Sequence, residues 1–143
     1  MKNKFAIVIV MLFSITSLFA QENVLGKWKT IDDDTGQAKS IVEIYQEDGV
    51  VKGKVVEILN KDRQDRVCEN CKGDKKNKPI LGMVIIENMK KDGNEYTGGT
   101  ILDPEKGKEY RCKLWLDEND KNKLNVRGYV AFLYRTQNWY RVD

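Results

Sequence analysis

Beyond residue 20, the chain alternates between short apolar runs and polar clusters. Runs rich in valine, isoleucine, tyrosine and tryptophan recur between groups of glycine, aspartate and asparagine, without a helical period. A period of two is typical of strands that bury one face, and the polar clusters are typical of turns. The pattern predicts eight strands: Leu25–Ile31, Ser40–Gln46, Val50–Leu59, Ile80–Asn88, Glu95–Leu102, Glu109–Leu116, Lys123–Phe132 and Arg135–Val142.

Two of these runs show the alternation most clearly. In the run 109–116, one face carries Tyr110, Cys112, Leu114 and Leu116. In the run 123–132, one face carries Leu124, Val126, Gly128 and Val130, and the other carries Asn125, Arg127 and Tyr129. One apolar face on each strand is what a sheet wrapped around an interior requires.

Most connections between the runs are short and carry turn residues. In 103–107, for example, Pro104 sets the first corner of a turn and Gly107 relieves the last. Eight strands joined by hairpins leave two exposed edges unless the sheet closes. We therefore expect an all-β fold, a single antiparallel eight-stranded up-and-down barrel whose interior holds packed side chains or one small ligand.

One connection, from Asn60 to Pro79, is much longer than the others and contains Cys68 and Cys71 in a C-x-x-C spacing. Long loops in compact domains often serve as functional lids or remain solvated. This one is rich in lysine, aspartate and asparagine, so the simpler interpretation is a solvated excursion to which the cysteine pair gives local shape.

The first residues have the layout of a secretory signal peptide. Two lysines precede an apolar run over residues 5–13, and a small residue, Ala20, precedes the polar Gln21. A transmembrane anchor needs roughly 18 apolar residues, whereas this run is interrupted at Ser14 and Thr16. We expect a signal peptide over residues 1–20, one barrel domain over 21–143, and a periplasmic or extracellular location without a transmembrane anchor.

Composition excludes several classes of function. Removing residues 1–20 removes two of the 25 basic residues and leaves 23 against 22 acidic ones, a net charge of +1. Nucleic-acid binding usually needs a marked basic excess, so nucleic acid is not an expected partner. The chain has no histidine, which removes Ser–His and Cys–His nucleophile pairs and the usual zinc hydrolase sites.

Two short motifs are similar to the lipocalin-like, or calycin, barrels. They are Gly26-Lys27-Trp28 on the first predicted strand and Arg141 on the last. In that superfamily the G-x-W packs near an arginine that closes one end of the barrel. The resemblance implies that Gly26, Trp28 and Arg141, with Trp139 beside them, form a structural barrel end.

A longer resemblance, from Val24 to Arg141, is to small secreted bacterial proteins of the domain of unknown function 2147. It is carried by Gly26-x-Trp28 with "DDDTGQAKSIVEIY", "GKVV" from Gly53, Cys68-x-x-Cys71-x-Gly73, "KPILGMVII", "GGTILDPEKGKEYRCKLWL", "LNVRGYV" and "RTQNWYR". The chain departs from the family pattern at Ala131 and Tyr134, where glycines are expected. The resemblance implies a fold and an exported location, and it implies no active site.

The cysteine pair has three possible roles: a metal site, a redox pair or a local disulfide. A structural zinc needs four ligands, whereas the only thiol besides Cys68 and Cys71 is Cys112. A redox pair usually lies at a helix N-terminus in a βαβ setting, which is missing here, although Lys72, Lys75 and Lys76 would stabilise a thiolate. A local disulfide is the expected state in an exported protein. Cys112 alternates with apolar residues, so we expect it to be buried, and we assign it no role.

Two clusters of polar residues are candidate ligand sites. Asp32, Asp33 and Asp34 are explained more simply as a hairpin turn than as the start of a calcium loop. In the last two predicted strands, arginines stand beside aromatic residues, a combination that holds anionic head groups through hydrogen bonds and stacking. Arg127 and Tyr129 share one face there and are the predicted ligand contacts.

These observations favour an exported lipocalin-like protein that binds a small apolar or amphipathic ligand without catalysis. A thiol–disulfide protein of the cell envelope using Cys68 and Cys71 is one alternative. A structural or protein-interaction module with a filled barrel is another. We expect no enzymatic activity, no metal site and no cofactor.

Overall fold

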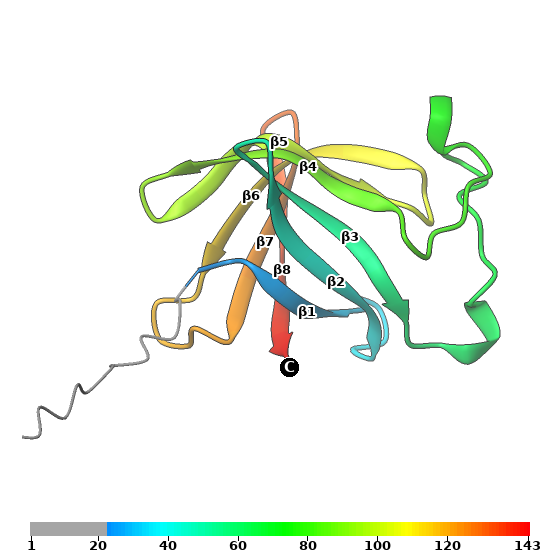
Figure 1. The fold of residues 1–143 in the computed structure, drawn as a ribbon, viewed down its shortest axis with the longest axis horizontal. Coiled ribbons are helices and arrows are strands. Elements are labelled where there is room, and N and C mark those ends of the chain that lie inside the picture. Colours follow the sequence, from blue (N-terminus) through cyan, green and yellow to red (C-terminus); the bar gives the residue numbers. More distant parts are fainter. Residues whose placement is uncertain (1–22) are drawn as a thin grey trace, which may run out of the picture.

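A computed structural model describes residues 23–143, which form one closed antiparallel barrel of eight strands in sequence order (Figure 1). The predicted all-β up-and-down barrel is therefore confirmed. The predicted signal peptide lies outside the described residues. The strands are β1 (Gly26–Ile31), β2 (Ala38–Glu47), β3 (Val50–Ile58), β4 (Val84–Asp92), β5 (Glu95–Asp103), β6 (Lys108–Leu116), β7 (Lys123–Val130) and β8 (Leu133–Val142).

The seam that closes the barrel is much shorter than the hairpins. β7 and β8 pair over eight residues, from Lys123–Tyr140 to Val130–Leu133. β1 and β8 pair over only three, and this pairing ends at Lys29 and Tyr140. An up-and-down topology places the β1–β2, β3–β4, β5–β6 and β7–β8 connections together at one end. The seam therefore leaves that end, which we call the open end, without a ladder between β1 and β8.

Large apolar side chains fill the middle of the barrel. The largest fully buried ones on the strands are Trp28, Val42, Ile44, Ile86, Met89, Leu114 and Leu124. Each contributes about 1.5–3 kcal/mol relative to an exposed position. Packing is tight at Gly53, where an added Cβ would lie 3.1 Å from Ile86 and 3.3 Å from Val42. These contacts account for a small residue in the centre of β3.

The start of the fourth predicted strand is wrong. It was expected over Ile80–Asn88, whereas β4 runs over Val84–Asp92. Ile80 and Met83 are buried, but they belong to the end of the long connection. Three polar residues, 90–92, continue β4 instead, because pairing of Asp92 with Glu95 extends the hairpin to β5.

The predicted boundary between the last two strands is also wrong. The seventh strand was expected to reach Phe132, whereas β7 ends at Val130 and β8 begins at Leu133. Ala131 and Phe132 form a two-residue turn, with Ala131 at φ 52°. Val130 was expected on the apolar face with Val126, but it is 53% exposed because it lies at the tip of the hairpin.

The long connection packs against the outside of the barrel instead of standing in solvent. It contains two short 3-10 helices, η1 (Lys61–Arg63) and η2 (Gly73–Lys75), and is seen beside the barrel in Figure 1. Cys68, Cys71 and Ile80 of this connection are buried in the same apolar cluster as Ile86 of β4. The loop thus extends the apolar core beyond the eight strands.

Candidate functional site

Arg141 closes the end of the barrel that holds both the start of β1 and the end of β8. Its guanidinium lies 4.3 Å from the centre of the Trp28 ring. It donates hydrogen bonds to the carbonyl oxygens of Leu25 at 2.9 Å and Asn23 at 2.8 Å. An added Cβ at Gly26 would lie 3.1 Å from the same guanidinium, and Gly26 has a φ of 123° that disfavours other residues. These contacts seal the closed end.

The open end carries a chain of polar side chains. Asp33, in the turn after β1, accepts a hydrogen bond from the Gln137 side chain at 2.6 Å and pairs with Arg135 at 3.2 Å. Gln137 accepts a hydrogen bond from the indole N–H of Trp139 at 3.0 Å. Trp139 is buried, and alternate residues of a strand share a face, so Arg135 and Gln137 belong to the inward face of β8. The polar chain therefore leads from the apolar interior to the rim.

Two hydroxyls face each other on β1 and β2 near the same end. Thr30 and Ser40 are partners in the ladder, and their side-chain oxygens lie 2.8 Å apart. Thr30 is the one polar residue counted as buried among residues 23–143. The inner face of the barrel thus changes from polar to apolar within about two residues, from Ser40 to Val42 on β2 and from Gln137 to Trp139 on β8.

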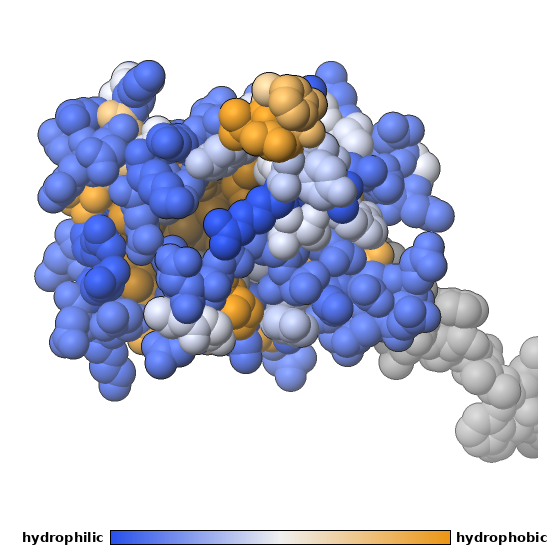
Figure 2. Space-filling model, turned by 180° about the vertical axis from the view of Figure 1, so that it is seen from behind, coloured by the Kyte–Doolittle hydropathy of each residue, from blue (hydrophilic) through white to orange (hydrophobic). Residues whose placement is uncertain are grey.

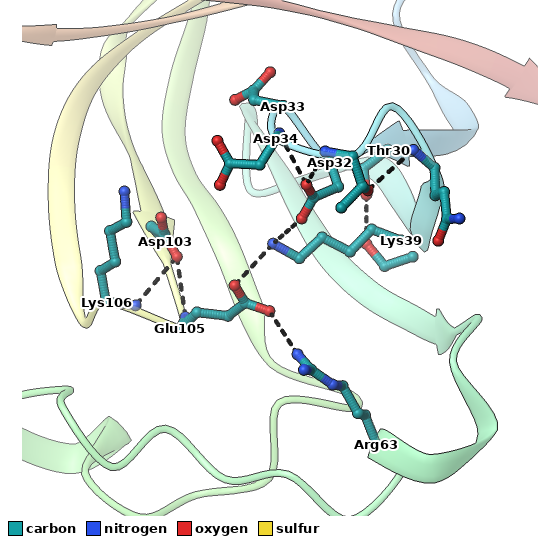
Figure 3. A network of polar contacts seen from close by, with 12 residues as sticks. Thr30, Asp32, Asp33, Asp34, Lys39, Arg63, Asp103, Glu105 and Lys106 are labelled. Atoms are coloured by element: carbon teal, nitrogen blue, oxygen red, sulfur yellow. Dashed lines mark hydrogen bonds and ion pairs between the residues drawn. The ribbon is translucent and has the colours of Figure 1, made fainter.

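Charged residues tie the loops of the open end together (Figure 3). Glu105, in the β5–β6 turn, pairs with Lys39 of β2 at 3.1 Å and with Arg63 of the long connection at 3.8 Å. Arg66 of the same connection also pairs with Glu105, at 3.4 Å. Lys39 also reaches Asp32 at 3.8 Å. Backbone N–H groups of Thr35 and Asp34 donate to Asp32, and they lower the pKa of its carboxyl. The rim is thus held by several weak, exposed ion pairs that share partners.

The barrel is hollowed beside the β7–β8 turn. Figure 2 shows a recess with an apolar floor and a polar rim below the apolar patch that this turn forms. A groove of about 790 Å³ also runs between the long connection and the β5–β6 and β7–β8 turns. It is lined by Tyr110 and Val130 and by four lysines, Lys72, Lys75, Lys106 and Lys108.

The predicted ligand contacts Arg127 and Tyr129 lie on the outer face, opposite the buried Val126. The Arg127 guanidinium lies 4.9 Å from the Trp115 ring and 4.2 Å from the Tyr134 ring, and it donates to the Thr136 hydroxyl at 2.8 Å. The Arg127 guanidinium thus already has three partners within the protein. Tyr129 instead borders a shallow hollow of about 310 Å³ over Gly98 and Gly99.

Asp33, Arg135 and Gln137 were not predicted as a site. The signal that could have found the two β8 residues is their shared parity with Trp139, because alternate residues of a strand lie on one face. Asp33 was interpreted as one of three turn acids. Nothing local distinguishes it from Asp32 and Asp34, because its partner Gln137 lies 104 positions away.

The cysteines occupy two separate environments. Cys68 and Cys71 have their sulfur atoms at disulfide distance, and both side chains are buried. Cys112 is free and buried inside the barrel, where burial raises the pKa of its thiol to about 12. Within residues 23–143, no three His, Cys, Asp or Glu side chains gather as metal ligands would. This part of the chain also has no helix with the length and apolarity to cross a membrane.

Comparisons with known proteins agree on the fold. A family model described as "Uncharacterized protein conserved in bacteria (DUF2147)" matches residues 26–141. Among solved structures, the chain is similar to protein HP1028 from the human pathogen Helicobacter pylori, described as belonging to the lipocalin family. That match has a TM-score of 0.72 and 17% identity, and it covers 85% of this chain and 84% of the other. No curated protein matches the sequence.

Proposed function

Because this chain belongs to the bacterial family DUF2147 and folds as a lipocalin-like barrel, we propose that it binds one small amphipathic molecule at the open end. The apolar part of the ligand lies in the recess beside the β7–β8 turn, and its polar head meets Arg135 and Gln137. The protein acts after export, in the periplasm or outside the cell, and it performs no catalysis.

The observation that carries this proposal is the difference between the two ends. At the closed end, the Arg141 guanidinium is used by carbonyl groups and by the Trp28 ring. At the open end, the Arg135 side chain is 65% exposed and pairs only with Asp33 among the described residues. Its remaining N–H groups are free to receive an acceptor, such as a carboxylate. Each CH₂ group of the ligand that enters the apolar interior adds about 0.8 kcal/mol.

The proposal of binding without catalysis rests on the side chains present. The chain has no histidine, and the thiol of Cys112 remains protonated at neutral pH because burial raises its pKa. A thiol–disulfide function is the second proposal from the sequence. Both cysteines of the C-x-x-C are buried in the apolar cluster, and exchange requires access for an attacking thiolate, so this burial disfavours a thiol–disulfide function.

Fluorescence titration with dansyl-labelled undecanoic acid tests the binding proposal. The chain from residue 21 onward holds all eight strands and is used throughout. We expect enhanced, blue-shifted dansyl emission, and about tenfold weaker binding in Arg135→Gln, since one charge-assisted hydrogen bond contributes about 1.5 kcal/mol. Arg127→Gln removes the same group from the outer face and serves as the matched comparison.

The outcomes separate the candidate sites. Weaker binding in Arg135→Gln but not in Arg127→Gln supports the open end. The reverse result supports the sequence-based placement at Arg127 and Tyr129, where the hollow over Gly98 and Gly99 would receive the ligand. An unchanged dansyl spectrum with wild-type protein contradicts fatty-acid binding and favours a barrel filled by its own side chains.

A further inference from the structure

The β7–β8 turn presents the most exposed apolar group of the described residues. Phe132 is 88% exposed, Leu133 65%, Tyr134 62% and Val130 53%. They are consecutive apart from Ala131, and they form the patch at the top of Figure 2. We call residues 130–134 the apolar tip. Side chains of this size are normally buried, and a contiguous exposed group marks an interaction site.

The tip stands on a basic support. Arg127 and Arg135 flank the tip in the sequence, and no acidic residue lies between Lys121 and Val142. Arg111 donates to the carbonyl oxygen of Ala131 at 2.9 Å, and Arg127 lies against the Tyr134 ring. Arg135 follows the tip directly. Three guanidinium groups therefore surround the base of an apolar projection.

A second basic surface adjoins the tip. Val130 borders the groove of about 790 Å³ that Lys72, Lys106 and Lys108 also line, together with the acidic Glu109. The β3–β4, β5–β6 and β7–β8 connections lie at the same end of the barrel, so Lys72 and Lys106 lie at the same end as the tip. Positive charge thus extends along one side of the apolar residues.

We propose that the apolar tip inserts into the surface of an anionic lipid bilayer and holds the open end of the barrel against it. Apolar and aromatic side chains above a ring of Arg and Lys are the combination that binds the boundary between head groups and acyl chains. The basic groups then meet lipid phosphates. A hairpin tip is convex, and its four exposed apolar side chains are far fewer than the roughly 20–30 residues that each partner contributes to a standard protein interface.

Docking in this orientation has a consequence for the proposed ligand. The recess in Figure 2 lies directly beside the tip, so insertion brings the open end to the level of the lipid head groups. An amphipathic molecule could then pass between bilayer and barrel without crossing water. The membrane proposal itself does not require the binding proposal, because it rests on the exposure and charge of the turn alone.

Vesicle co-sedimentation tests the proposal with the chain from residue 21 onward, so that the apolar residues 5–13 contribute nothing. Vesicles contain equal parts of phosphatidylcholine and phosphatidylglycerol, or phosphatidylcholine alone. We expect binding to the anionic vesicles, at least tenfold weaker partitioning in the double variant Phe132→Ser/Leu133→Ser, and wild-type partitioning in Leu81→Ser. Leu81 is 42% exposed on the long connection and is the matched control.

Three further measurements distinguish membrane insertion from unfolding of the variant and from loss of ligand binding. Thermal unfolding of the double variant should match that of the wild type, since both side chains are exposed. Its affinity for dansyl-labelled undecanoic acid in solution should also be unchanged, which separates this proposal from the ligand proposal. The emission of a Phe132→Trp protein should shift to the blue on anionic vesicles.

Failure has several recognisable forms. Absence of wild-type binding to anionic vesicles overturns the proposal, as does equal weakening by Leu81→Ser. If the double variant changes only the oligomeric state in analytical ultracentrifugation, the tip contacts a second copy of the chain instead. Equal binding to both vesicle types would refute the role of the arginines and lysines.

Discussion

Replacing Arg141 by glutamine tests how the barrel is closed. Arg141 connects the end of β8 to the segment before β1 and stacks on Trp28. The β1–β8 ladder has only three residue pairs, so this side chain supplies a large share of the contacts across the seam. Glutamine retains one donor group but neither the charge nor the reach to two carbonyl oxygens.

The expected loss follows from these contacts. Charge-assisted hydrogen bonds contribute about 1.5–3 kcal/mol each, and partial exposure places the two short bonds of Arg141 at the lower limit. Its contact with the Trp28 ring adds about 1 kcal/mol. Glutamine recovers roughly one neutral hydrogen bond of about 1 kcal/mol. The free energy of unfolding should therefore fall by about 2–3 kcal/mol.

Urea denaturation followed by tryptophan fluorescence measures this loss. With an m value of about 2 kcal/mol per molar urea, the midpoint should fall by about 1–1.5 M. Arg135→Gln is the control, because its single exposed ion pair with Asp33 contributes at most about 1 kcal/mol. If Arg141→Gln shifts the midpoint no more than Arg135→Gln does, the closing role assigned to Arg141 is wrong.

Three other predictions concern single positions. Since burial raises the pKa of Cys112 to about 12, iodoacetamide should label its thiol in urea but not in the native protein at pH 8. The free energy of unfolding should fall as the pH rises above 9.0, the ordinary pKa of a cysteine thiol, and Cys112→Ala should remove this slope. Ala131→Gly should raise the free energy of unfolding by about 0.5–1 kcal/mol, because φ 52° strains alanine; a loss in urea denaturation would contradict this. Because the pKa of Asp32 is lowered, its ionised carboxylate stabilises the fold above pH 3.8, and Asp32→Ala should be less stable than the wild type at pH 7. This difference in stability should shrink as the pH falls through the lowered pKa. A difference independent of pH would argue against the hydrogen bonds from Thr35 and Asp34.

Local patterns were sufficient for most of the strands. The alternation in the run 109–116 predicted the burial of Cys112 and Leu114, and that in 123–132 predicted the burial of Leu124 and Val126. The turn after β5 also follows its residues: the Asp103 carboxylate accepts the N–H groups of residues 105 and 106. Such features depend on neighbours within a few positions, and these are visible in a sequence.

Burial without alternation misled the prediction of β4. Ile80 and Met83 are buried, as their apolar character suggested, but they lie at the end of the long connection and not on a strand. Hydrophobicity predicts that a side chain leaves water, and it does not specify the backbone conformation that takes it there. The same limit applies to Val130, whose parity with Val126 was correct while its exposure depended on the hairpin extending past the barrel wall.

The sequence by itself determined the number of strands, most of their turns and, on regularly alternating strands such as β6, the face on which each residue lies, because a period of two is a property of the backbone within one strand. Only the tertiary structure decided which arginine meets the open end. Arg127 lies on the outer face, whereas Arg135 reaches the rim, where Asp33 from the far end of the chain meets it. That meeting exists because the sheet closes on itself with a seam of three residue pairs, and closure depends on all eight strands together.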